Sequence, residues 1–97
     1  MKNSSTVLSL LFLLLSSTTV FAQNNPCTIT KVDLSKDNYL VGDFASVKKE
    51  LVPCVKAQSF ENPDVLNQAR ELLALTAIVE DSLELAKVYI FEIVSSN

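Results

Sequence analysis

The sequence predicts an all-α protein. Helix-breaking residues are scarce, with one glycine and three prolines among 97 residues, and the segments between them are rich in the helix formers Leu, Ala, Glu and Gln. Apolar residues recur in these segments at spacings of three and four, as on one face of a helix. Alternation at period two, typical of strands, is never sustained. We therefore expect four helices, at about 28–41, 44–58, 63–79 and 82–95, forming two antiparallel helical hairpins.

The first helix is expected to end at Gly42, because glycine readily adopts the left-handed backbone that follows many helices. Asp43 can then cap the second helix by accepting hydrogen bonds from its first free amides. Pro53 lies within this second segment, where proline removes one backbone hydrogen bond. We expect a kink there; the alternative is that the helix ends at Val52 and leaves Cys54 in a loop.

The third helix has a clear start, with Asn62 as its cap and Pro63 at the first helical position, where a missing amide proton costs nothing. For the last helix, Asp81 and Glu84 have the spacing of a capping box. Residues 88–94, VYIFEIV, have strand-like propensities, but their position after an Ala-containing helical lead favours a helix.

The first 22 residues are predicted to be a cleavable signal peptide. Lys2 supplies a positive charge, residues 7–15 are almost wholly apolar, and Val20 and Ala22 occupy the positions that signal peptidase recognises. A membrane anchor is the alternative, but it needs roughly 20 apolar residues, and a lipid anchor would need a cysteine directly after the cleavage site. We expect an exported chain, periplasmic or secreted, that begins near Gln23 and has no membrane span.

The remaining chain divides into a flexible lead-in, residues 23–27, and a helical domain, residues 28–97. Cys27 and Cys54 are the only cysteines. Because an exported chain meets an oxidising compartment, we expect them to form an intrachain disulfide. A redox-active pair is the alternative, but such pairs are closely spaced in sequence.

Composition argues against several classes of function. Once Lys2 is removed, seven basic residues face 11 acidic ones, which disfavours nucleic acid as a partner. The chain has no histidine, no glycine-rich phosphate loop and no zinc-like spacing of cysteines. Glu80, Asp81 and Glu84 could support acid–base chemistry, but their place at a turn favours capping and solvation. We therefore expect no catalytic residue, cofactor or metal, and no enzymatic activity.

The two turns between paired helices align as a weak internal repeat. The matched segments are Gly42-Asp43-Phe44 with Asp81-Ser82-Leu83, Leu34-Ser35 with Leu73-Ala74, and Val47, Leu51 and Cys54 with Ala86, Ile90 and Ile93. This pattern resembles the tetratricopeptide repeat, a helix-turn-helix unit, here in an exported bacterial protein. The copies are 39 residues apart, against a usual 34. A generic four-helix bundle is the alternative architecture.

The last predicted helix is apolar around most of its circumference. Either it is central in the bundle, or one face is left uncovered and docks a protein partner or a second copy of the chain. The candidate interaction surface consists of Leu85, Val88, Tyr89, Phe91 and Val94. The leading hypothesis is a non-catalytic adaptor that binds a protein through this surface; the alternative is a small secreted effector or inhibitor with a helical-bundle fold.

Overall fold

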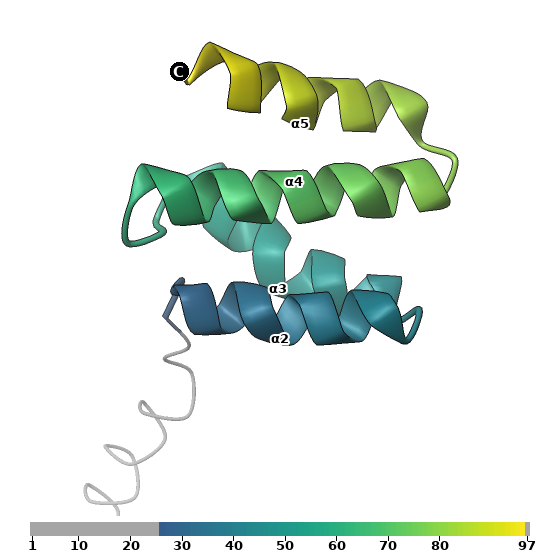
Figure 1. The fold of residues 1–97 in the computed structure, drawn as a ribbon, viewed down its shortest axis with the longest axis horizontal. Coiled ribbons are helices and arrows are strands. Elements are labelled where there is room, and N and C mark those ends of the chain that lie inside the picture. The colour runs from purple at the N-terminus through teal and green to yellow at the C-terminus, as the bar shows by residue number, and fades with distance from the viewer. Residues whose placement is uncertain (1–25, 97) are drawn as a thin grey trace, which may run out of the picture.

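The computed structural model describes residues 26–96, and this part of the chain is all-helical, as predicted (Figure 1). Four helices follow one another and no strand occurs among these residues: α2 (Ile29–Leu40), α3 (Phe44–Ala57), α4 (Pro63–Val79) and α5 (Leu83–Ser95). The predicted boundaries hold to within one residue. The predicted signal peptide, residues 1–22, and the lead-in residues 23–25 lie outside the described residues.

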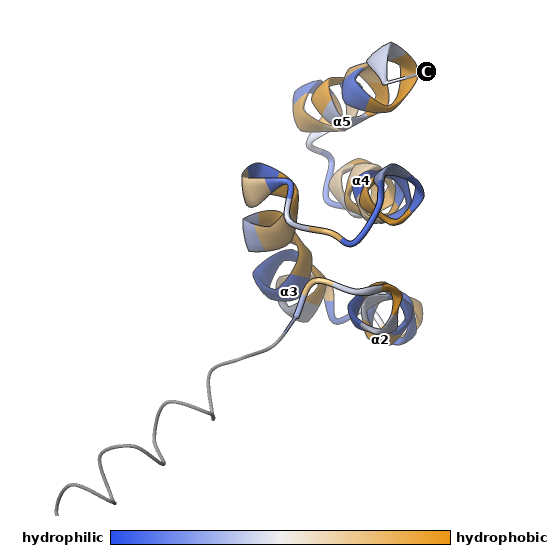
Figure 2. Ribbon diagram, turned by 90° about the vertical axis from the view of Figure 1, so that its left-hand side faces the viewer, coloured by the Kyte–Doolittle hydropathy of each residue, from blue (hydrophilic) through white to orange (hydrophobic). Residues whose placement is uncertain are grey.

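Helix α4 is the centre of the arrangement. It contacts all three other helices, whereas α5 contacts α4 alone. Helices α2, α4 and α5 run side by side in Figure 1, and the turned view of Figure 2 shows α3 on one side of α2 and α4. The core therefore sits between α2, α3 and α4, and its most buried members include Val32, Val47, Leu51, Leu72 and Leu73.

Three helices end in a left-handed residue: Gly42 after α2, Gln58 after α3 and Asp81 after α4. Each end has the two backbone hydrogen bonds of a Schellman motif. After α4, for example, the Asp81 amide donates to the Ile78 carbonyl at 3.0 Å and the Ser82 amide donates to the Ala77 carbonyl at 2.7 Å. The two turns that the internal repeat aligns therefore have the same backbone geometry.

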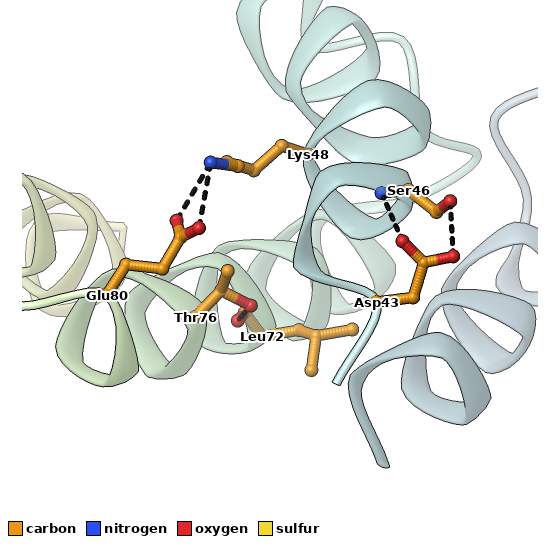
Figure 3. Close-up of polar contacts among 6 residues, drawn as sticks. All are labelled: Asp43, Ser46, Lys48, Leu72, Thr76 and Glu80. Carbon is orange, nitrogen blue, oxygen red and sulfur yellow. Dashed lines mark hydrogen bonds and ion pairs between the residues drawn. The ribbon is translucent and has the colours of Figure 1, made fainter. Parts of the chain in front are cut away.

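The predicted caps of α3 and α4 are confirmed. The Asp43 carboxylate accepts the Ser46 hydroxyl proton at 2.7 Å and the Ser46 backbone amide proton at 3.2 Å (Figure 3). These two hydrogen bonds, the hydroxyl first, lower the pKa of Asp43 below its ordinary value of 3.8. Asn62 accepts from the Val65 amide at 3.0 Å, and Pro63 is the first residue of α4.

The predicted capping box at Asp81 and Glu84 is wrong. Because Asp81 takes the left-handed conformation that ends α4, the N-cap position of α5 moves to Ser82. Glu84 is then the second residue of the helix, not the third, and it lies 3.2 Å from the Lys87 ammonium. No side chain caps the start of α5.

Helix α3 continues through Pro53 to Ala57, so the alternative end at Val52 is also wrong. Cys54 lies on the buried side of this helix and forms the predicted disulfide with Cys27, with the two Cα atoms 5.8 Å apart. The bond ties the start of α2 to the last turns of α3.

Two contacts from the loop after α3 strengthen this junction. The Ser59 hydroxyl donates to the Cys27 sulfur at 3.2 Å. Glu61 accepts from the Ile29 amide at 2.9 Å, and so satisfies a free amide at the first turn of α2, where Thr28 makes no side-chain cap. The N-terminus of α2 is thus capped by a residue 32 positions away.

Candidate interaction surface

Helix α5 lies at the periphery of the described structure, and only Ala86 of this helix is buried. Figure 2 shows hydrophobic residues over much of α5. Of the predicted interaction residues, Phe91 is 71% exposed and Val94 65% exposed, while Leu85 and Val88 are about half exposed. Tyr89 differs, because it is half-buried and packs against the core. The alternative of a central last helix is therefore wrong.

Apart from Val88, the apolar side chains of α5 that are not buried fall into two groups. Leu85 and Tyr89, together with Lys48 and Val52 of α3 and residues of α4, line a hollow of about 40 Å³. A space of this size accommodates a few water molecules at most. Burial, with a smaller contribution from nearby Glu92, raises the pKa of the Tyr89 hydroxyl above its ordinary value of 10.0. This side of α5 is thus partly closed by the protein itself.

The second group lies on the other side of α5. Leu83, Ile90 and Val94 are separated by seven and four residues, so they form one stripe along the helix, with Phe91 beside it. All four side chains are about half exposed or more. Leu83 and Ile90 were not among the predicted interaction residues.

Ile78 of α4 extends this stripe onto the neighbouring helix. Asn67, Ala74 and Ile78 lie seven and four residues apart, on one line along α4, and the Asn67 amide donates to the Ser96 hydroxyl at 2.8 Å, next to the end of α5. That line therefore borders α5. Ile78 is 47% exposed. We call Ile78, Leu83, Ile90, Phe91 and Val94 the outer face.

The surroundings of the outer face are mainly acidic. From Asp64 to Ser96 the chain has six acidic residues and two basic ones, Arg70 and Lys87. Arg70 is 7% exposed, donates from Nη1 to the Asn67 carbonyl oxygen at 2.9 Å, and forms none of the ion pairs within residues 26–96. Lys87 is exposed beside Glu84. Negative charge therefore dominates the accessible surface of α4 and α5.

The carboxylates at the α4–α5 turn do not gather into a site. Glu80 binds the Lys48 ammonium of α3 at 2.8 Å (Figure 3), and Glu84 lies beside Lys87. Between residues 26 and 96, no group of three or more Cys, Asp or Glu side chains is arranged to hold a metal ion. None of the helices described is both long and apolar enough to cross a membrane.

A second apolar hollow lies between α2 and α4. It has a volume of about 420 Å³, and its lining consists of Lys36, Tyr39, Leu40, Gln68, Glu71, Leu72 and Leu75. The described surface thus has an apolar groove on one side of α4 and the outer face on another.

No protein-family model matches this chain, and no curated protein or solved structure matches it either.

Proposed function

We propose that this protein is a non-catalytic, exported interaction module with tetratricopeptide-like helical hairpins, and that it binds a protein partner through the outer face. The observation that carries the proposal is the exposure of five large apolar side chains along two adjoining helices. Large contiguous apolar patches are rarely exposed on soluble monomeric proteins, and where they occur they often mark interaction sites.

The energy available from this surface is substantial. Full burial of one large aliphatic or aromatic side chain contributes about 1.5–3 kcal/mol. The five side chains are between 47% and 71% exposed, so a partner that covered them would gain about 4–8 kcal/mol gross. That gain offsets a large part of the roughly 4–15 kcal/mol cost of association, and hydrogen bonds at the rim would add to it.

Export is the second part of the proposal. The disulfide between Cys27 and Cys54 is compatible with an oxidising compartment such as the periplasm or the extracellular space. The sequence pattern of residues 1–22 is the signal that would direct the chain there. Mass spectrometry of the secreted chain would detect the new N-terminus that we expect at Gln23.

Site-specific photo-crosslinking in the cells that make the protein tests the interaction. A benzophenone amino acid in place of Phe91 should yield discrete crosslinked products. The matched control carries the same group in place of Lys49, which is exposed on α3, and should yield none. If irradiation produces no product specific to position 91, the outer face is not an interaction surface and the proposal fails.

A further inference from the structure

The internal repeat allows the two halves of the domain to be compared residue by residue. With the offset of 39 residues, Leu51 and Val55 of α3 correspond to Ile90 and Val94 of α5. Leu51 is fully buried and Val55 nearly so, within the core that α4 completes. Ile90 and Val94 are 47% and 65% exposed. Ile90 and Val94 of the outer face are thus the equivalents, in the second half, of residues that are buried in the core between α2, α3 and α4 in the first.

The covering helix has a defined pattern. The residues through which α4 enters the core are small or aliphatic and recur at helical spacing: Val65, Ala69, Leu72, Leu73 and Thr76. Thr76 is accommodated because its hydroxyl donates to the Leu72 carbonyl at 2.9 Å (Figure 3). A helix that covers the outer face in the same way needs a comparable stripe.

The first helix of a second copy does not offer that stripe. The residues of α2 that correspond to Ala69, Leu72 and Thr76 are Thr30, Asp33 and Asp37. Stacking α2 of one copy on the outer face of another would bury the Asp37 carboxylate and the Asp33–Lys36 ion pair against apolar side chains, which is unfavourable. Continuous head-to-tail assembly of this chain is therefore disfavoured.

Face-to-face pairing of two outer faces is disfavoured by charge. Glu71 stands where the first half has the fully buried Val32. Glu71 lies seven residues before Ile78, on the same line of α4, so two copies meeting through this face would bring two Glu71 carboxylates toward one interface. Like charges that approach on association weaken binding, whereas complementary charges favour it.

Building on the proposed function, we infer that the outer face binds an amphipathic helix of another protein. This helix has small and aliphatic residues at the spacing of the α4 stripe and Lys or Arg along its flanks. It lies against α4 and α5 as α4 lies against α2 and α3, with its basic residues near Glu71.

A synthetic helix based on α4 tests this inference. The probe is a fluorescently labelled peptide of residues 62–79 in which Asp64 and Glu71 are replaced by Lys, and the titrant is the oxidised full chain. We expect saturable binding by fluorescence anisotropy that weakens as salt is added, because charge attraction is screened. A control peptide with Leu72→Asp and Leu73→Asp, which disrupt the stripe, should not bind.

Variants of the full chain locate the binding site. Ile90→Glu and Val94→Glu alter exposed side chains, so the fold should persist, as circular dichroism can verify. Each should weaken peptide binding by about tenfold or more, as expected for central contacts. The matched control is Val41→Glu, at an exposed valine after α2, which should bind as the unaltered chain does.

The outcomes separate this inference from the proposed function. Absence of peptide binding, or binding that both glutamate variants retain, overturns the helix as occupant even if crosslinking at position 91 succeeds. Light scattering that shows a dimer of the chain, dissociated by Ile90→Glu, also overturns it by identifying a second copy as the occupant. If crosslinking at position 91 fails, the proposed function itself is lost.

Discussion

Removal of the disulfide should destabilise the domain strongly. The bond joins residues 27 positions apart, and for a loop of this length the chain-entropy model gives about 3.5 kcal/mol of stabilisation at 25 °C. In a domain of 60–100 residues, each kcal/mol shifts the melting temperature by roughly 4–8 °C. Reduction should therefore lower the melting temperature by about 15–25 °C.

Thermal unfolding followed by circular dichroism at the helical minimum, with and without a phosphine reductant, measures this shift. The control is the double variant Cys27→Ser, Cys54→Ser, which should melt near the reduced chain and respond to no reductant. A decrease below about 5 °C would refute the reasoning. It would mean that Ser59 and Glu61 already hold the start of α2 in place, or that the unfolded chain is restricted without the bond.

Five further variants test individual features of the structure. Leu51→Ala should cost about 2–5 kcal/mol in urea unfolding and Ile90→Ala clearly less, because only the first side chain is fully buried; equal losses would contradict the uncovered outer face. Ser35→Ala should stabilise by about 1 kcal/mol, since the buried Ser35 hydroxyl has no partner among the described residues. Asp81→Gly should stabilise by about 0.5–1 kcal/mol by relieving the left-handed backbone, and a loss would refute this. Asp43→Asn should lower the urea midpoint near neutral pH. The pKa of Asp43 is lower in the folded chain than in the unfolded chain, so the ionised carboxylate stabilises the fold at any pH above the unfolded pKa. This stabilisation is lost as the pH falls through the folded pKa. The two midpoints should therefore converge below pH 3.8, and a gap that persists at pH 2 would contradict the assignment.

The helices could be predicted because their ends are marked by residues with a local mechanism. Gly42, Asp43 and Asn62 act within a few residues of their own positions, so their roles are visible in sequence alone. The disulfide was equally accessible, since Cys27 and Cys54 are the only cysteines. Sequence alone does not exclude a capping box at Asp81, because aspartate serves both as an N-cap and, less often, as a residue with a left-handed backbone.

The contacts that sequence could not supply are those made over long distances. Glu61 accepts from the first turn of a helix that begins 32 residues earlier, and no local sequence pattern predicts a hydrogen bond between residues so far apart. Arg70 carries a charge, and charged residues are mostly exposed, yet it is buried. In the first half of the repeat, the residue equivalent to Arg70 is Lys31, which lies 3.4 Å from the carboxylate of Glu50. In the second half, the position equivalent to Glu50 holds Tyr89, so Arg70 has no carboxylate at that position.

The exposure of the candidate interaction residues could be predicted only in part. A helix that is apolar all round does not reveal which side is covered, because that depends on the neighbouring helices. The predicted set therefore mixed Tyr89, which packs inward, with Phe91, which faces outward. Ile90 was missed, although its alignment with Leu51 in the internal repeat was the signal that could have identified it.

Because α5 contacts only one of the other described helices, α4, it has a particular place in the motions of the domain. A helix with one buried residue and one neighbour can detach at a free-energy cost below that of global unfolding. In native-state hydrogen exchange, the amides of α5 should exchange faster than those of α3 and α4, which surround the core. A bound partner would add a second neighbour to α5. Slower hydrogen exchange of the α5 amides would then show that a partner is bound to the outer face, even when exchange in the core is unchanged.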